Sequence, residues 1–261
     1  KESIYEIIDS CSLSENEEVE LQKYVNNRGL IFISTPFSRA AANRLIKMDI
    51  PAYKIGSGEC NNYPLIKHIA KEGKPVILST GMNTIGSIQK AVDIFRYYKV
   101  PFALLHCTNV YPTPPELVRL GAMVELEKEF PDAVIGLSDH TITNYPSIGA
   151  VAQGASIIER HFTDDRYRNG PDIRCSMDAN ELKFLINRGK EIHLAINNSK
   201  FGTEPEEHVY KFARSSVVAD RKLTKGTILD NRDIWVRRPG TGPIAAYDYY
   251  KVLGRKLKND K

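Results

Sequence analysis

Two polar triplets, Ser-Asp-His and Glu-Arg-His, each close an apolar run of the sequence. Residues at positions i and i+2 of a strand point to the same face, so Ser138 shares a face with His140, and Glu159 shares one with His161. Two imidazoles on neighbouring strand ends can bind one divalent ion, and imidazole suits manganese, iron, zinc or cobalt. The spacing therefore predicts a metal site at His140 and His161. The alternative is two unrelated polar residues at strand ends.

A lysine interrupts another apolar run, just before the sequence Gly-Ser-Gly-Glu. Burying an ammonium group costs free energy unless an anion accompanies it, so Lys54 predicts a phosphate or carboxylate ligand. Ser57 follows between two glycines, where backbone amides and a hydroxyl can cradle a phosphate, provided that the strand ends just before it. Ser79 and Asn109 end two further runs and add neutral donors. The alternative is that the Lys54 ammonium reaches through the end of the fold into water.

Three other polar residues stand in segments that follow the apolar runs. Glu59 comes soon after the lysine and is a candidate general acid or base, although a solvated loop carboxylate is the simpler interpretation of this residue alone. Tyr111, in the sequence Asn-Val-Tyr-Pro, could face a sugar. Asp172, in the sequence Gly-Pro-Asp, could bind sugar hydroxyls, whereas aspartate in such a loop is usually a turn residue.

These residues need a scaffold that brings strand ends together, and the apolar runs supply one. Each run ends in a polar cluster and is followed by a helix-like stretch. Strands of a parallel sheet are nearly continuously apolar, and a TIM (β/α)8 barrel places its active site at the carboxyl ends of its strands. The pattern predicts such an α/β barrel, with an open α/β sheet as the alternative. The expected strands lie within residues 30–35, 52–59, 75–81, 102–109, 133–140 and 156–161.

Six strands are two fewer than this barrel needs, and the chain begins on a helix-like stretch. We therefore expect the first two strands to be missing, which makes the chain an N-terminally truncated barrel. Amphipathic spacing and capping residues predict the helices. One of them has Thr113 and Glu116 at the spacing of a capping box, with proline at the first helical position. The expected helices span residues 4–28 (as one or two helices), 39–48, 63–71, 84–98, 113–130, 144–154 and 178–196.

The sequence changes in character after residue 196. Residues 197–211 are polar and turn-rich, which predicts a linker. Short apolar runs separated by a Lys-Gly turn then predict a small, mostly β domain over residues 212–261. The barrel domain would accordingly comprise residues 1–196.

The composition limits the classes of partner. The 261 residues carry 36 basic and 32 acidic side chains, a net charge of +4, and no basic block indicates a nucleic-acid partner. The four cysteines lie far apart without a Cys-x-x-Cys pair, which is typical of a reducing compartment. No apolar stretch approaches the roughly 18 residues of a membrane span, and no signal peptide is recognisable. We therefore expect a cytoplasmic protein without a membrane segment.

Together these motifs resemble those of the sialic acid synthase family, whose members condense phosphoenolpyruvate with an N-acetylated aldose. The resemblance extends over essentially the whole chain and is nearest to bacterial synthases for neuraminic or legionaminic acid. Residues 237–240 (RRPG) match within a C-terminal module of the antifreeze-like (SAF) type. The other matching segments are 34–38 (STPFS), 53–59 (YKIGSGE), 79–82 (STGM), 107–112 (CTNVYP), 136–140 (GLSDH), 159–163 (ERHFT) and 170–172 (GPD).

The resemblance implies a role for each matching residue. His140 and His161 would bind the divalent metal, usually manganese, with magnesium or cobalt as other choices, and Glu59 would be the acid/base. In this family the C-terminal module is swapped between the subunits of a homodimer, so that Arg238 would reach the N-acetyl group in the partner's site. The phosphoenolpyruvate ligands would be Lys54, Ser57, Ser79, Asn109 and Ser138. Thr35, Tyr111 and Asp172 would lie near the sugar, and Glu159 would be a further substrate-binding residue.

The chain departs from the family at its start, and two other functions stay open. The Asn-His and Lys-x-x-Gln segments of the family's first strands have no counterpart here, which puts the activity of the chain by itself in doubt. One alternative is a related phosphoenolpyruvate-dependent 3-deoxy-sugar phosphate synthase. Its second phosphate would need further cations, for which Arg160, Arg166, Arg168 and Arg174 are the candidates. The other alternative is a non-catalytic sugar-binding fragment.

Overall fold

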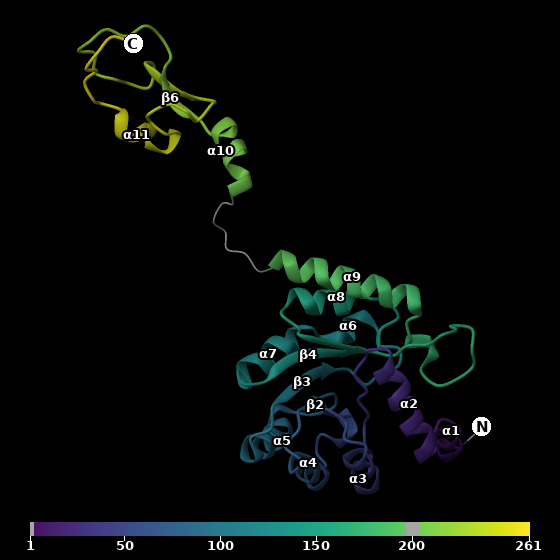
Figure 1. Cartoon of the computed structure of the whole chain (residues 1–261). Coiled ribbons are helices and arrows are strands. Elements are labelled where there is room, and N and C mark those ends of the chain that lie inside the picture. Colours follow the sequence, from purple (N-terminus) through teal and green to yellow (C-terminus); the bar gives the residue numbers. More distant parts are fainter. Residues whose placement is uncertain (1–2, 197–203) are drawn as a thin grey trace. The chain divides into compact units, whose positions relative to one another are not determined.

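The computed structural model describes residues 3–196 and 204–261, which belong to two compact units, residues 1–197 and residues 198–261. The first unit is built on a parallel five-stranded sheet whose strands are neighbours in the order of the sequence. Figure 1 shows this curled sheet with its helices ranged around the outside. The strands are β1 Tyr53–Ile55, β2 Val76–Ser79, β3 Phe102–Cys107, β4 Val134–Asp139 and β5 Ile157–Arg160.

The strand order distinguishes a barrel-type sheet from a doubly wound one. In a doubly wound sheet the order reverses at a switch point, whereas here each helix crosses over to the next strand in the same direction. The central strands are apolar because both of their faces are covered, and all six residues of β3 are buried, whereas the residues of β5 are half-buried. The core between sheet and helices includes the fully buried side chains of Tyr53, Leu78, Leu104 and Phe95. The sheet is therefore an arc of a barrel, and β1 and β5 form its two edges.

The helices follow the predicted alternation with strands. Ser3 and Ser14 each begin a helix with a complete capping box, so the first helical stretch is divided in two. None of the helices in residues 3–196 and 204–261 combines the length and the apolar character needed to cross a membrane. The helices of the first unit are α1 Ile4–Ser10, α2 Glu15–Asn27, α3 Arg39–Lys47, α4 Tyr63–Ala70, α5 Ile85–Tyr98, α6 Pro115–Val118, α7 Gly121–Glu129, α8 Tyr145–Ala152 and α9 Ala179–Ile196, with 3-10 turns at η1 Ser57–Glu59 and η2 Ile173–Cys175.

Two expectations about local structure are wrong. The helix expected over 113–130 is broken into α6 and α7, because Arg119 adopts a left-handed conformation with φ 54°. Thr113 does not cap it, since its hydroxyl donates instead to the carbonyls of Thr108 and Val110. The run 30–35 forms only an isolated parallel bridge, from Ser34 to β1.

The failure of residues 30–35 to form a strand has a structural cause. Within the part of the chain that the structure describes, this run has a neighbour on the β1 side only, and the single bridge between Ser34 and Tyr53 is the pairing that it makes there. Leu30 and Ile31, two residues of this run, are accordingly 65% and 73% exposed. The apolar character that predicted a buried strand is present, but no second neighbouring strand covers it.

The second unit is small and has its own core. Strands β6 Ser216–Ala219 and β7 Ile234–Arg237 pair in antiparallel fashion. Leu223, Leu229, Ile234 and Tyr249 are buried together beneath them. Helices α10 Glu207–Ala213 and α11 Tyr249–Val252, with 3-10 turns at η3 Glu204–Glu206 and η4 Ala246–Asp248, complete it. Residues 197–203 of the predicted linker 197–211 lie outside the described residues. Its remaining residues, 204–211, form η3 and the first part of α10.

Candidate active site

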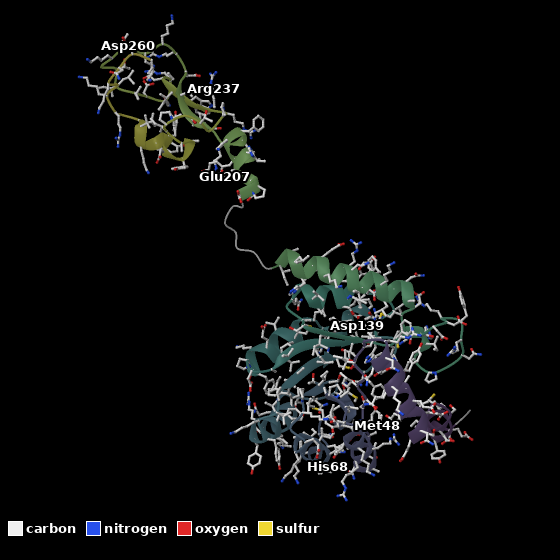
Figure 2. All side chains as sticks on the ribbon, viewed as in Figure 1. Met48, His68, Asp139, Glu207, Arg237 and Asp260 are labelled. Atoms are coloured by element: carbon white, nitrogen blue, oxygen red, sulfur yellow. The ribbon has the colours of Figure 1, made fainter. Side chains whose placement is uncertain are left out.

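The polar residues that close the strands lie at one rim of the sheet. The register pairs Cys107 of β3 with Ser138 of β4, and Ser138 with Glu159 of β5. His140 and His161 come two residues beyond Ser138 and Glu159 on the same faces. Figure 2 shows Asp139, between Ser138 and His140, at the sheet near α8, whereas His68 of α4 lies at the periphery of this unit.

Lys54 is the centre of a buried polar network. The residue is only 9% exposed, and its Nζ donates to Ser79 Oγ at 2.9 Å and to the Ile55 carbonyl at 3.1 Å. Glu159 Oε2 lies 3.5 Å from the same ammonium group. The other carboxylate oxygen of Glu159 accepts a bond from Ser138 Oγ at 2.7 Å. Lys54 therefore does not reach into water, and Glu159 is its anionic partner in the absence of a ligand.

A tight turn beside this network brings Ser57 and Asn109 together. The Gly81 amide donates to Ser57 Oγ at 3.0 Å. A Cβ on Gly81 would lie 1.8 Å from Asn109 Oδ1 and 3.0 Å from Ser57 Oγ. Only glycine permits this approach, because any side chain would occupy the space of the Asn109 amide. The expected anion ligands Lys54, Ser57, Ser79 and Asn109 thus border one region.

The two histidines form an aromatic cluster with Tyr111. The ring centroids of His140 and His161 are 5.3 Å apart, and Tyr111 stacks on His140 at 4.1 Å and meets His161 edge-on at 5.8 Å. Asp172 adopts a left-handed conformation with φ 60°. Its Oδ2 lies 3.7 Å from His161 Nδ1. Burial, with the charges of Cys107 and Asp172, raises the pKa of Tyr111 to about 12.

The hydrogen bond of His140 decides which of its nitrogens is available. His140 Nδ1 lies 2.9 Å from the Thr108 carbonyl oxygen. A carbonyl only accepts, so Nδ1 carries the proton and Nε2 keeps its lone pair. Metal-binding histidines commonly donate their other nitrogen to a backbone carbonyl in this way. No group of three or more His, Cys, Asp or Glu side chains suited to a metal occurs in residues 3–196 and 204–261, so the fit rests on two imidazoles, with other donors left to substrate and water.

Cys107 is a site residue for which the sequence suggested no role. Its Sγ lies 4.0 Å from His140 Nδ1 and 3.5 Å from Asn109 Oδ1. Burial raises the pKa of Cys107, but hydrogen bonds with His140, Ser57 and Ser138 outweigh burial, so that this pKa is lowered. Burial by itself would lower the pKa of His140. The hydrogen bonds of His140 with Cys107 and Thr108 outweigh burial, so that the pKa of His140 is raised. The sequence did contain one signal for a role of Cys107 in the site: it lies two residues before Asn109, so both residues share a strand face.

A cavity of about 660 Å³ opens beside the lysine network. Thr35, Lys54 and Glu159 contribute polar groups to its wall, and the remainder is mostly apolar, including Phe32 and Ile158. A site of this size with a few convergent polar groups suits a small ligand. Thr35 is thereby placed near Lys54 and Glu159, as a sugar ligand would need to be.

Two residues expected in the site are not joined to these networks. Glu59 accepts a bond from Asn62 Nδ2 at 2.5 Å, within its own turn, and no described contact connects it with Lys54 or the histidines. Arg238 belongs to the second unit. The structure does not define how the two units are placed, so its role stays a prediction.

Three of the four arginines considered for a second phosphate are engaged elsewhere. Arg160 is buried and paired with Asp139. Arg166 pairs with Glu181 on α9 and Arg168 with Asp164, each at 2.7–2.8 Å. Arg174 is exposed. Of the four, Arg174 is therefore the one for which the described residues show no carboxylate partner.

Comparison with known proteins identifies the family of this chain. Residues 1–201 match the NeuB family, and residues 214–261 match the SAF domain. The chain belongs to the NeuB family. It is 35% identical to the N,N'-diacetyllegionaminic acid synthase of Campylobacter jejuni, over 97% of this chain and 77% of that protein. It is 32% identical to human N-acetylneuraminate-9-phosphate synthase, over 94% of this chain and 68% of that protein.

A solved relative supports the fold as well as the family. The N-acetylneuraminic acid synthetase of Leptospira borgpetersenii, solved with citrate, superimposes with a TM-score of 0.75 and 30% identity, over 78% of this chain and 71% of that one. The prediction of a barrel-type α/β domain followed by an SAF domain is confirmed, and so is the resemblance to sialic acid synthases.

Proposed function

We propose that this NeuB-family chain condenses phosphoenolpyruvate with an N-acylated aldose, which gives a nine-carbon sugar acid of the sialic acid type and phosphate. The observation that carries the proposal is the buried Lys54–Glu159–Ser138 network beside the pair His140 and His161. Relatives named synthases of legionaminic acid and of N-acetylneuraminate 9-phosphate support the reaction class.

The anion-binding side of the site suits phosphoenolpyruvate. Its phosphate and carboxylate can replace Glu159 as partners of the Lys54 ammonium, with the Ser57 and Ser79 hydroxyls and the Asn109 amide as further donors. Donors held in a site shielded from water stabilise developing charge more strongly than they would in solution. The enol carbon of phosphoenolpyruvate bonds to the aldehyde carbon, and a water molecule then adds to C2. The resulting tetrahedral centre releases phosphate by cleavage of its C–O bond, while these groups remain hydrogen-bonded to the phosphate.

The histidine side suits the aldose. A divalent ion, for which we propose manganese with magnesium or cobalt as alternatives, would supply Lewis acidity toward the aldehyde oxygen. His140 and His161 would hold that ion, and Tyr111 shields His140 from water on one ring face. Asp172 lies beside His161, where its carboxylate can accept a hydrogen bond from a sugar hydroxyl. Glu159 lies between both halves and is placed to move a proton at the aldehyde oxygen or at the attacking water. Glu59 remains a second candidate for that role.

We infer an acceptor sugar without a phosphate of its own. A phosphorylated acceptor needs cations at the rim, and Arg160, Arg166 and Arg168 are already paired. The substrates we propose are therefore N-acetylmannosamine or its 2,4-diacetamido-6-deoxy analogue. We further propose a cytoplasmic homodimer in which the partner's SAF domain brings its own copy of Arg238 to the sugar.

Phosphate release tests the reaction. A version of the chain that also carries the Asn-His and Lys-x-x-Gln segments of the family is incubated with phosphoenolpyruvate, manganese and one sugar at a time, with Lys54→Met as the control for weakened phosphoenolpyruvate binding. We expect release with an N-acylated hexose and none with arabinose 5-phosphate. Release with arabinose 5-phosphate alone would replace the proposal by a 3-deoxy-sugar phosphate synthase, and sugar binding without any release would indicate a non-catalytic protein.

A further inference from the structure

A single buried guanidinium lies behind the histidine pair. Arg160 stands between Glu159 and His161, so its side chain leaves β5 on the opposite face from theirs. That side chain is 1% exposed, as is the side chain of Asp139, whose Oδ2 lies 3.8 Å from Arg160 Nη1. Charges so enclosed are stable only when further hydrogen bonds satisfy them.

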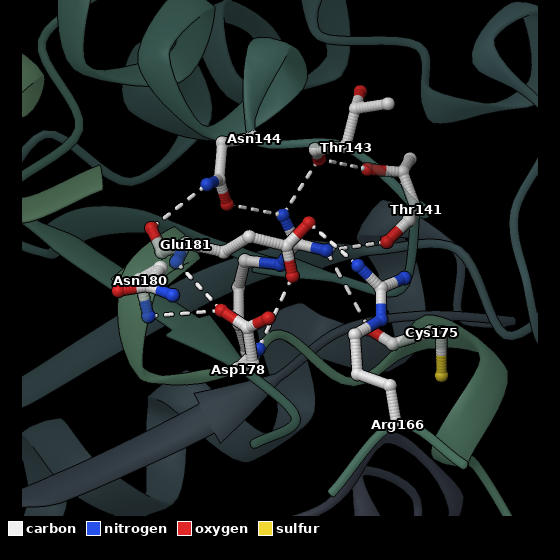
Figure 3. A network of polar contacts seen from close by, with 9 residues as sticks. Thr141, Thr143, Asn144, Arg166, Cys175, Asp178, Asn180 and Glu181 are labelled. Carbon is white, nitrogen blue, oxygen red and sulfur yellow. Dashed lines mark hydrogen bonds and ion pairs between the residues drawn. The ribbon is translucent and has the colours of Figure 1, made fainter. Parts of the chain in front are cut away.

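The guanidinium collects acceptors from two loops. Its Nη1 donates to the Thr143 carbonyl at 2.6 Å and to Asn144 Oδ1 at 2.7 Å. Its Nη2 donates to the Thr141 carbonyl and, at 3.5 Å, to the Cys175 carbonyl. Figure 3 shows Thr141, Thr143, Asn144 and Cys175 gathered from the two loops around one centre. The planar fork of arginine matches such a set, whereas a lysine ammonium does not reach all four.

Each loop held in this way carries a site residue. Thr141 directly follows His140, and its amide also donates to Asp139 Oδ1 at 2.9 Å. Cys175 ends the turn that begins at Asp172, and its amide donates to the Asp172 carbonyl at 3.1 Å. Arg160 also directly precedes His161 in the chain. Three segments bearing His140, His161 and Asp172 therefore meet at one side chain.

We propose that Arg160 is a positioning residue that sets the separation of the two imidazoles and keeps the Asp172 carboxylate beside His161. It touches no reacting atom, since its side chain lies on the far face of β5. The consequence for metal binding rests on the proposed function, whereas the ordering of the two loops does not.

Arg160→Lys tests this role, with Arg166→Lys as the matched control. Arg166 belongs to the same polar region (Figure 3), but it is 34% exposed and its described partner is Glu181 on α9. The first readout is amide hydrogen exchange of residues 141–144 and 172–176. The second is affinity for manganese alone, by electron paramagnetic resonance, and affinity for phosphoenolpyruvate alone, by calorimetry.

We expect Arg160→Lys to exchange at least tenfold faster in both segments and to bind manganese about 10- to 100-fold more weakly, the usual effect of losing an outer partner of a metal ligand. Affinity for phosphoenolpyruvate should change less than twofold, because Lys54 and Ser79 lie outside the affected loops. The control should match the unaltered chain throughout. A uniform loss of both affinities, in step with lost stability, would reduce Arg160 to a general structural residue and overturn the proposal.

Two further outcomes keep the tests separate. If the unaltered chain binds no manganese, the metal assignment fails, while unchanged exchange of the two segments in Arg160→Lys would still refute the positioning role. If Arg160→Lys does not fold, the double variant Arg160→Met with Asp139→Asn removes both buried charges and is measured in its place. Protection of the two segments at the level of the unaltered chain would then contradict the proposal.

Discussion

Substituting Gly81 by alanine tests whether the close approach of three strand ends builds the anion site. The new Cβ would stand 1.8 Å from Asn109 Oδ1, where ordinary contact begins at 3.4 Å, and 3.0 Å from the Cys107 carbonyl oxygen. The Cys107 carbonyl belongs to the sheet and cannot retreat. The Asn109 amide is on a side chain, so it is the group that must turn away.

Gly81→Ala should weaken the binding of phosphoenolpyruvate more than it lowers the free energy of unfolding. Overpacking costs about 1–3 kcal/mol, and we expect the lower end because the half-buried Asn109 side chain can rotate into the open site. Losing one hydrogen bond to a charged ligand costs about 1.5–3 kcal/mol. At about 1.4 kcal/mol per factor of ten, the dissociation constant for phosphoenolpyruvate should rise about 10- to 100-fold.

Calorimetry with phosphoenolpyruvate measures this effect, and Gly58→Ala is the matched control. A Cβ on Gly58 meets no atom within 4 Å, so Gly58→Ala should bind like the unaltered chain. Unfolding in urea should show a similar free energy for both variants to within about 1 kcal/mol. Equal affinity in Gly81→Ala and Gly58→Ala would refute the reasoning, because it would mean that Asn109 makes no contact with the anion.

Four other substitutions, with His68→Ala as a control, probe the rest of the domain. His140→Ala and His161→Ala should each lose manganese binding together with rate, whereas His68→Ala at the periphery should not; normal manganese affinity in both would exclude the metal role. Lys54→Ala should raise the apparent constant for phosphoenolpyruvate at least tenfold, more than that for the sugar, in steady-state kinetics, and the opposite pattern would assign the lysine to the sugar. Leu104→Ala, at a fully buried position of β3, should lower the free energy of unfolding in urea by about 2–5 kcal/mol, and a smaller loss would mean that the core relaxes around the cavity.

Much of the fold followed from local patterns. The strands β1 to β5 and most helices lie where apolar runs and caps predicted them, because side-chain burial and capping depend on residues close in sequence. Predictions that depended on a distant partner were less successful. Residues 30–35 have strand-like composition but lack a second neighbour, and α6 and α7 are separate because Arg119 takes a left-handed turn that composition does not announce.

The candidate site divides in the same way. The position of each motif at the carboxyl end of a predicted strand placed Lys54 and His140 at the same rim from the sequence alone, and parity along the strand predicted which residues share a face. Parity does not say which groups bond to each other. The pairing of Lys54 with Glu159 joins β1 to β5, the two edges of the arc, and only the curvature of the sheet brings them within 3.5 Å.

The sequence by itself determined the alternation of strands with helices, the strand ends at which the polar residues gather and the division into an α/β domain and a small β domain, since these depend on periodicity and chain order. Only the tertiary structure decided that Cys107 lies among the serines and His140, that Gly81 must have no side chain and that the Arg160 guanidinium collects acceptors from two loops. The physical reason is that hydrogen bonds and close contacts depend on positions defined to within about an ångström, and folding brings together loops that the sequence keeps far apart.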